Sequence, residues 1–173
     1  MRIAVYAGTF DPITSGHLSV VERAQVLFDR VVVVVAVNPS KEPLFAPAER
    51  VACIEEATSA MGNVAVESTE GLVVELARRL QARFLVRGVR GVTDIEAEIA
   101  LAHANAELAP EIATVFVPAE PRLAQVSSSR LKELARAGHD VSAYCTPEVA
   151  LRLRARFGEG GRRSAGEAEW RSR

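Results

Sequence analysis

One segment near the start of the chain combines residue types that suit phosphate chemistry. GTFDPITSGH, from Gly8 to His17, places glycines, threonines and a histidine directly after a short apolar run. His17 falls in the first turn of the helix that should follow, where free N–H groups and the helix dipole favour an anion. An imidazole there can donate a hydrogen bond to a phosphate oxygen that gains charge in a transition state. The alternative is a core histidine bonded to a carbonyl group, but the surrounding glycines and threonines favour phosphate binding.

Further segments carry groups that suit anions. In RGVRG, Arg87 and Arg90 follow an apolar run, and planar guanidinium groups bind phosphate oxygens in pairs. In VSSSR, the serines 127–129 open a helical pattern, and their hydroxyls and free N–H groups together can hold a phosphate. Lys41, in NPSKEP, adds a mobile point charge. The alternative for each is a solvated charge or a plain helix cap, although a cap needs only one serine.

These residues lie between elements of a regular strand–helix alternation. Strands are predicted at 2–7, 30–37, 64–67, 83–87 and 112–117, and helices at 16–28, 47–61, 71–81, 93–108, 128–137 and 147–157. The run from Val31 to Val37 is apolar on both faces, which is typical of a strand inside a parallel sheet that helices cover on both sides. The sequence therefore predicts an α/β fold: a single-domain, Rossmann-like, doubly wound sheet of five parallel strands with helices on both faces.

The predicted sheet can bring two of the segments together. Open parallel sheets bind ligands beyond the carboxyl ends of their strands, where the strand order reverses. The Gly8–His17 segment follows the first predicted strand, and the Arg87–Gly91 segment follows the fourth. If these two strands are neighbours, both segments face one crevice.

Composition limits the class of protein. The chain has 173 residues, of which 49% are apolar and 25% charged, as expected for one globular domain. The formal net charge of −1 gives no general attraction to nucleic acid or to an anionic membrane, so neither is expected as a partner. Cys53 and Cys145 match no metal or redox spacing, and the sequence shows no leader and no membrane-spanning run. We expect a cytoplasmic protein without a metal site built from its own side chains.

Residues 158–173 differ in composition from the rest of the chain. They are rich in Gly, Arg and Ser and contain almost no aliphatic side chains. Such a segment cannot bury enough apolar surface to order itself. We therefore predict one domain over 1–157 and a disordered tail over 158–173, with Trp170 as an exposed aromatic residue.

In order and spacing, the motifs GTFDPxTxGH, NPSK, RGVR, DIEAE and VSSSRLKE closely resemble those of the bacterial phosphopantetheine adenylyltransferases. The resemblance covers residues 2–157, and TSGH is similar to the (H/T)xGH motif of the wider nucleotidyltransferase superfamily. It implies a nucleotidyltransferase domain that moves AMP from ATP to 4′-phosphopantetheine, giving dephospho-coenzyme A and pyrophosphate with Mg²⁺. It also implies a homohexamer and coenzyme A as a feedback ligand.

The resemblance further implies roles for individual residues. His17 would stabilise the transition state, with Lys41 and Arg90 as further catalytic residues. Because the acceptor is already an anionic phosphate, it would attack the α-phosphate in line, without a general base or a covalent enzyme intermediate. The acceptor would be held by Thr9, Lys41, Val73, Arg87 and Asn105. ATP would be held by Thr9, Phe10, His17, Gly88, Val89, Arg90, Glu98, Leu123, Ala124, Gln125, Val126, Ser127, Ser128 and Ser129.

The chain departs from the family where adenine contacts are expected. The family usually has an aromatic residue shortly before the serines, but this chain reads RLAQV over 122–126, so any contact there is aliphatic or polar. Two alternative functions stay open. One is a sister nucleotidyltransferase with nicotinamide mononucleotide or a polyol phosphate as acceptor. The other is a regulatory module that binds ATP without turning it over.

Overall fold

The five predicted strands form one parallel sheet in the order β3-β2-β1-β4-β5. The structure is a computed structural model that describes residues 1–38, 40 and 42–158. β1 pairs with β2, where Ile3 lies opposite Arg30, and with β4, where Ala4 lies opposite Phe84. The strands are β1 (Ile3–Gly8), β2 (Arg30–Ala36), β3 (Val64–Thr69), β4 (Phe84–Val89) and β5 (Ala113–Pro118). The predicted α/β fold is confirmed, and the first and fourth strands are neighbours.

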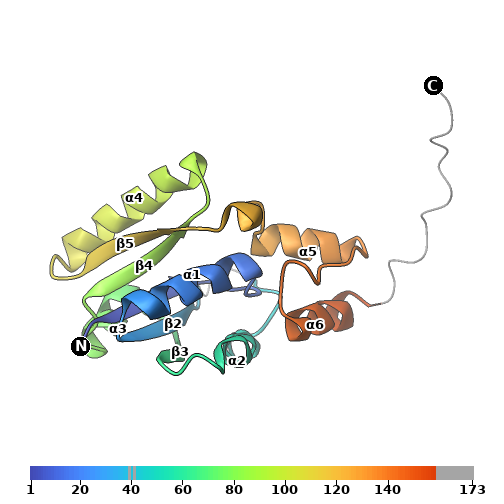
Figure 1. Cartoon of the computed structure of the whole chain (residues 1–173), viewed down its shortest axis with the longest axis horizontal. Helices are drawn as coiled ribbons and strands as arrows, with labels where there is room; N and C mark the ends of the chain where they lie inside the picture. The colour runs from blue at the N-terminus through green and yellow to red at the C-terminus, as the bar shows by residue number, and fades with distance from the viewer. Residues whose placement is uncertain (39, 41, 159–173) are drawn as a thin grey trace.

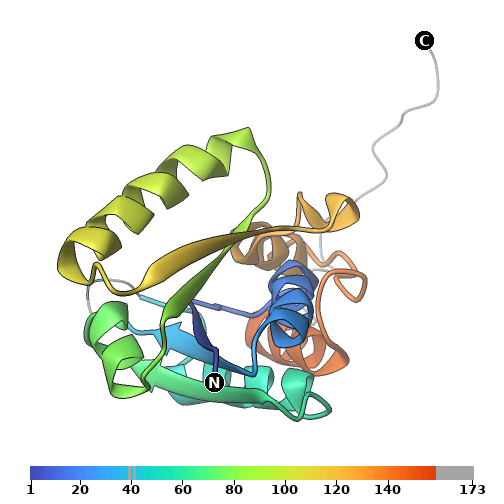
Figure 2. The same cartoon turned by 60° about the vertical axis from the view of Figure 1, so that its left-hand side comes forward.

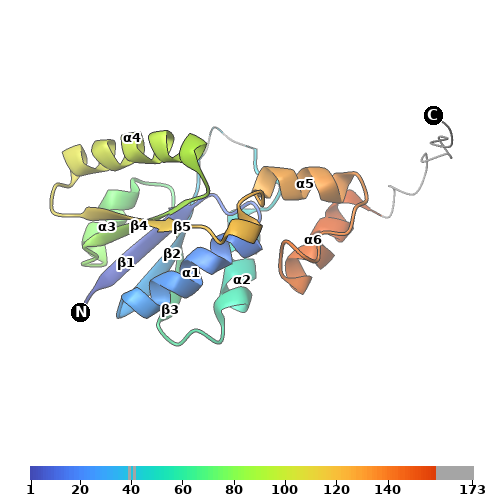
Figure 3. The same cartoon turned by 45° about the horizontal axis from the view of Figure 1, so that its top comes forward.

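Helices cover both faces of this sheet (Figure 1). α1 (Ser15–Leu27) and α2 (Pro47–Thr58) lie on one face. α3 (Val73–Arg79) and α4 (Val92–Leu108) lie on the other, as Figure 3 shows. The 3-10 helix η1 (Pro121–Leu123), α5 (Ser128–Arg136) and α6 (Pro147–Phe157) follow β5 and gather at the end of the sheet toward which the strands run.

The valine run forms the centre of the sheet. Val31 to Val35 are completely buried. Val31, Val33 and Val35 pack into a core cluster with residues of α1 and α2, whereas Val32 and Val34 pack into a second cluster with residues of α3. Because successive side chains of a strand point to opposite faces, an unbroken apolar run is stable only when both faces are covered.

Capping signals place the helix boundaries close to the predicted ones. Thr14 caps α1, since its Oγ1 accepts a hydrogen bond from the N–H of His17. A proline at the first position opens both α2 and α6. The helix predicted over 71–81 is shorter at both ends in the structure. Leu72 before it is extended, and Gln81 after it has a φ of 55°, outside the helical region.

β4 is longer than predicted. It runs past residue 87 to Val89 because it stays paired with β5, with Arg87 opposite Phe116 and Gly88 opposite Val117. Arg87, predicted as the last residue of this strand, therefore lies within the strand and not at its end. A strand holds its side chain at a fixed place over the edge of the sheet.

The described part of the chain ends just after α6. Phe157 closes this helix and lies under the guanidinium of Arg136 in α5, 5.0 Å from ring centroid to Cζ. Residues 159–173, with Trp170 and nearly all of the predicted tail, lie outside the described residues, as does Lys41. Among the helices that the structure describes, none is long and apolar enough to cross a membrane.

Candidate active site

A cavity of about 390 Å³ opens at the carboxyl ends of β1 and β4. The strand order reverses here, because β1 leads to β2 and β3 on one side while β4 leads to β5 on the other. We call it the strand-end cavity. The predicted site residues that line it are Phe10, His17, Arg87, Gly88, Arg90, Glu98, Val126, Ser127, Ser128 and Ser129. Segments far apart in the sequence therefore meet at the expected crevice.

His17 is held by the start of its own helix. The Thr14 N–H donates to Nδ1 of His17 at 3.2 Å, and the His17 N–H donates to Thr14 Oγ1 at 3.3 Å. Because Nδ1 accepts a hydrogen bond, the neutral ring has its proton on Nε2, which remains available as a donor. Burial lowers the pKa of His17 to about 4, and the charge of Arg90 adds to this effect. The imidazole is thus neutral at pH 7 and is not the carbonyl-bonded core histidine of the alternative interpretation.

The first loop packs aromatic rings beside His17. The buried Phe10 ring meets the His17 ring edge-on, with centroids 5.1 Å apart, and the Tyr6 ring at 5.3 Å. Phe10 has a φ of 47°, a left-handed conformation that costs an ordinary residue about 1–3 kcal/mol. The ring folds back over Gly8, where a Cβ would lie 2.9 Å from Phe10 Cζ. The aromatic ring itself therefore requires a glycine at this position.

Arg87 is anchored from two sides. Its Nε and Nη2 donate to the Glu98 carboxylate, the latter at 2.9 Å, and its Nη1 donates to the Ala7 carbonyl at 2.9 Å. A guanidinium has more N–H groups than these bonds use, so Arg87 can still donate to an oxyanion. Glu98, which was predicted to lie near ATP, lines the cavity and orients this arginine.

Arg90 is held by a residue that the sequence did not single out. Its Nε donates to Asp94 Oδ2 at 2.7 Å, and its Nη2 donates to Oδ1 at 3.1 Å. These hydrogen bonds lower the pKa of Asp94 below its usual value, so the carboxylate stays ionised. The i,i+4 spacing of the pair was a signal in the sequence.

Gly88 allows β4 to pack closely on α1, since a Cβ there would lie 2.9 Å from Val20 Cγ2.

The three serines have different roles at the start of α5. Ser127 caps the helix by accepting a hydrogen bond from the Arg130 N–H at 3.1 Å. Ser128 Oγ donates to the carbonyl of Pro12 in the first loop at 2.7 Å. The groups of this helix start that could still bind an anion are therefore its free backbone N–H groups and Ser129.

A second cavity of about 220 Å³ lies between β1, β4, α3 and α4. We call it the α3–α4 cavity. Three residues predicted to hold the acceptor line it, namely Val73, Arg87 and Asn105. Most of the remaining lining is aliphatic, and Arg87 lines the strand-end cavity as well. The α3–α4 cavity thus has a largely aliphatic lining with one guanidinium, Arg87, at the border that it shares with the strand-end cavity.

Several predicted residues lie outside these two cavities. Thr9 is exposed between the two lining residues Gly8 and Phe10. Gln125 lines a separate cavity of about 260 Å³, together with Tyr144. Lys41 lies outside the described residues. The residues that line neither the strand-end nor the α3–α4 cavity are Thr9, Val89, Leu123, Ala124 and Gln125.

Three polar residues around the first loop were not among the predicted site residues, although Asp11 belongs to the GTFDPxTxGH motif. Tyr6 lines the strand-end cavity, and burial raises the pKa of its phenol above the usual range, so it stays a neutral donor. Arg50 in α2 is 2% exposed and donates through Nη1 to the Thr9 carbonyl at 2.9 Å. Asp11 is buried and paired with Lys132. Tyr6 lies within an apolar strand and Arg50 within a charged helix, so neither residue stands out in the sequence.

The carboxylates in the strand-end cavity are both engaged with arginines. Asp94 pairs with Arg90, and Glu98 pairs with Arg87. Among the described residues, no group of three or more His, Cys, Asp or Glu side chains is placed to hold a metal ion.

Known proteins resemble this chain in sequence and in fold. The cytidylyltransferase-like family model matches residues 5–134. A phosphopantetheine adenylyltransferase of Heliobacterium modesticaldum is 47% identical over 159 residues, which cover 92% of this chain and 95% of that protein. The corresponding protein of Thioalkalivibrio sulfidiphilus is 48% identical over 156 residues, with coverages of 90% and 98%. The structure of Plasmodium falciparum nicotinic acid mononucleotide adenylyltransferase complexed with NaAD has the same fold, with a TM-score of 0.64, 14% identity and coverages of 90% and 95%.

Proposed function

The chain belongs to the cytidylyltransferase-like family and, within it, to the phosphopantetheine adenylyltransferases, and on this premise we propose how its residues perform the reaction. It transfers AMP from ATP to 4′-phosphopantetheine and releases dephospho-coenzyme A and pyrophosphate. The observation that carries this function is an identity near one half over nearly the full length of both chains.

The shared wall of the two cavities supports a place for each substrate. ATP would occupy the strand-end cavity, with its phosphates at the first-turn N–H groups of α5. The pantetheine arm would occupy the α3–α4 cavity against Val73 and Asn105, with its phosphate at Arg87. Because Arg87 lines both cavities, the acceptor phosphate would lie next to the α-phosphate of ATP. The geometry then favours direct transfer.

His17 would act as a hydrogen-bond donor at the reacting phosphate. An oxygen of the acceptor phosphate forms a bond to the α-phosphorus while the bond to the β-bridging oxygen breaks, and pyrophosphate leaves with the electron pair. The Nε2–H of the neutral imidazole donates to the α-phosphate oxygen as its charge rises. Because Nδ1 is occupied by the Thr14 N–H, the ring is suited to donate and not to abstract a proton.

The remaining predicted contacts complete the two substrate sites in this proposal. Thr9 and Lys41 join Arg87 around the acceptor phosphate, and Arg90 places a second guanidinium beside the triphosphate. Phe10 and the backbone of 88–90 border ATP, while residues 123–126 supply aliphatic or polar contacts to adenine. Glu98 acts through Arg87, because its carboxylate holds that guanidinium in place.

Mg²⁺ would enter as a part of the ATP complex. Mg²⁺ is commonly held by substrate phosphates and water with few protein carboxylates. The two carboxylates of the strand-end cavity are paired with arginines, so the described side chains offer it no free ligand set. In this proposal the triphosphate oxygens hold the cation and lose part of their charge to it, and the protein contributes the arginines and N–H groups around them.

We extend the proposal to the assembly and setting of the enzyme. α4 supports an assembly of several copies, a homohexamer in the proposal, because it exposes Val92, Ile99 and Leu108 to solvent. Cys53 and Cys145 are both free thiols, which suits a reducing compartment such as the cytoplasm. Coenzyme A, which contains the product, would compete at the same two cavities as a feedback ligand.

A screen of acceptors tests the function. The protein is mixed with ATP and Mg²⁺, and pyrophosphate release is measured with 4′-phosphopantetheine, with nicotinamide mononucleotide or with no acceptor. We expect release only with 4′-phosphopantetheine, together with a product that has the mass of dephospho-coenzyme A. Release only with nicotinamide mononucleotide would mean that this compound, and not 4′-phosphopantetheine, is the acceptor. No release from a folded protein that binds ATP would indicate a regulatory module.

A further inference from the structure

Asp11 is a buried carboxylate that accepts hydrogen bonds from three donors in two other parts of the chain. Its side chain is only 6% exposed. The N–H groups of Leu44 and Phe45 each donate to it at 2.9 Å, and Lys132 Nζ of α5 donates at 2.7 Å. Burial alone would raise the pKa of Asp11, but these hydrogen bonds outweigh burial and lower the pKa below its usual value. The carboxylate therefore stays ionised and joins the first loop to α5 and to the segment before α2.

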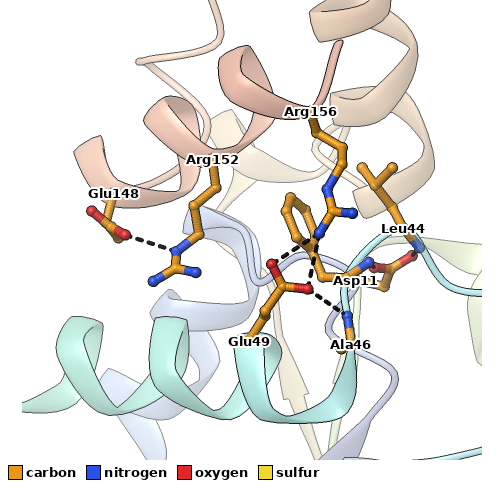
Figure 4. A network of polar contacts seen from close by, with 8 residues as sticks. Asp11, Leu44, Ala46, Glu49, Glu148, Arg152 and Arg156 are labelled. Atoms are coloured by element: carbon orange, nitrogen blue, oxygen red, sulfur yellow. Dashed lines mark hydrogen bonds and ion pairs between the residues drawn. The ribbon is translucent and has the colours of Figure 1, made fainter. Parts of the chain in front are cut away.

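The segment before α2 is itself anchored, as Figure 4 shows. The Ala46 N–H donates to Glu49 Oε2 at 2.8 Å, and Arg156 of α6 donates to the same carboxylate at 2.9 Å. The Arg156 guanidinium also lies over the Phe45 ring, 5.4 Å from its centroid. The segment whose N–H groups donate to Asp11 is thus also held by Arg156 of α6.

The loop around this carboxylate is restrained at further points. Arg50 turns the Thr9 carbonyl toward α2, and Ser128 of α5 donates to the Pro12 carbonyl. Between these contacts, Phe10 keeps its φ of 47°. A left-handed residue of this kind persists only where its surroundings hold it. The network therefore fixes the wall of the strand-end cavity formed by the first loop.

We propose that Asp11 is a positioning residue of the reaction, which it serves through its ion pair with Lys132. The pair holds the start of α5 against the first loop, so that the α5 N–H groups and Phe10 border ATP at a fixed separation. The pair also cancels the charge of a carboxylate that would otherwise repel the phosphates. The inference rests on the proposed function, because it needs ATP phosphates at the start of α5.

Substitution of Lys132 separates this role from a general effect on folding. In Lys132→Met the buried carboxylate loses its cation, and we expect the KM for ATP to rise about tenfold while kcat changes less than about threefold. Lys132→Arg keeps the charge and is expected to keep KM near that of the unchanged protein. Arg130→Met is the matched control, because it removes an exposed positive charge from the same helix. Its KM is expected to stay within about twofold.

The pattern of constants decides the outcome. A merely structural role would reduce the fraction of active enzyme, so kcat would fall while KM for ATP stayed constant, and this result would overturn the proposal. The double variant Asp11→Asn, Lys132→Met removes the unpaired charge and is expected to recover part of the lost affinity. No recovery, in a double variant with an unchanged unfolding midpoint, would contradict the charge argument.

Binding of MgATP keeps this test apart from the acceptor screen. Calorimetry measures the dissociation constant whether or not the protein turns over. Weaker binding by about tenfold in Lys132→Met, but not in Arg130→Met, supports the positioning role even if 4′-phosphopantetheine is not the acceptor. Equal binding by the two variants would overturn it while leaving the proposed acceptor untouched.

Discussion

α1 and α4 both follow a strand that ends at the site, but the chain fixes them in different ways. α1 has a side-chain cap from Thr14 and buries Val20, Val21 and Ala24 against the sheet. α4 begins at Val92 after the N-cap residue Gly91, which provides no side-chain cap, and none of the described side chains of α4 is buried. Figure 2 shows α4 running along the outside of the molecule.

The difference teaches how each side of the site is held. His17 is positioned by the cap and packing of its own helix, so its geometry exists before any ligand arrives. Arg87 and Arg90 are positioned by the carboxylates of α4, Glu98 and Asp94, through ion pairs. Charged pairs can exchange partners with a phosphate, whereas a helix cap in a packed core cannot. The α1 side of the site is therefore rigid and the α4 side adjustable.

Substitution of His17, on the rigid α1 side, should have the largest effect on turnover. We expect His17→Ala to lower kcat by about 10²–10³-fold, because one preorganised donor to the transition state is lost. The dissociation constant of ATP should change little. Steady-state kinetics and calorimetry measure both quantities, and His103→Ala, an exposed histidine of α4, is the control. Near-normal turnover of His17→Ala would contradict the role of the histidine.

The protonation of His17 should make stability depend on pH. Its pKa falls from the ordinary 6.5 to about 4 on folding, so between these values only the unfolded chain binds the proton. The contribution of the neutral His17 to the free energy of unfolding is present above pH 6.5. It is lost as the pH falls toward 4, which lowers the free energy of unfolding by roughly 3 kcal/mol. Urea unfolding at pH 7.5 and at pH 4 measures this change. His17→Asn should remove most of it, and an equal pH dependence in both proteins would rule out a buried neutral imidazole.

Loss of the Glu98 carboxylate, on the adjustable α4 side, should weaken binding of the acceptor. In Glu98→Gln the Arg87 guanidinium loses its ionic partner, and we expect the KM for 4′-phosphopantetheine to rise about tenfold. The KM for ATP should rise less. Glu111→Gln is the control, since it breaks the exposed pair with Arg78 on the same face of the sheet. A fall in KM would mean that Glu98 competes with the acceptor phosphate and does not orient Arg87.

The exposed face of α4 should affect assembly more than catalysis. Ile99→Lys places a charge on this apolar surface, and we expect a smaller particle by analytical ultracentrifugation with kcat within about threefold. Val26→Lys, at an exposed valine of α1, should leave the mass unchanged. If neither variant changes the mass, α4 is not an assembly surface.

The sequence predicted the sheet better than the details of the site. The Val31–Val37 run and the strand–helix alternation were sufficient for the parallel fold, because both are patterns of burial that a sequence displays directly. The first loop, the arginines and the serines were found because their residue types suit phosphate. Arg50 was not found, and Asp11 was quoted only as a part of the GTFDPxTxGH motif, because whether a charged residue is buried depends on contacts distant in sequence. The same limit applies to Gln125, which lines a different cavity from the one expected.

Exchange of labelled pyrophosphate into ATP tests most directly that the two substrates react across Arg87. Direct transfer requires both cavities to be occupied, so we predict exchange only when dephospho-coenzyme A is present with Mg²⁺. An adenylylated enzyme would form from ATP alone and would support exchange without any pantetheine compound. Exchange in that control would contradict the direct in-line reaction between the two cavities.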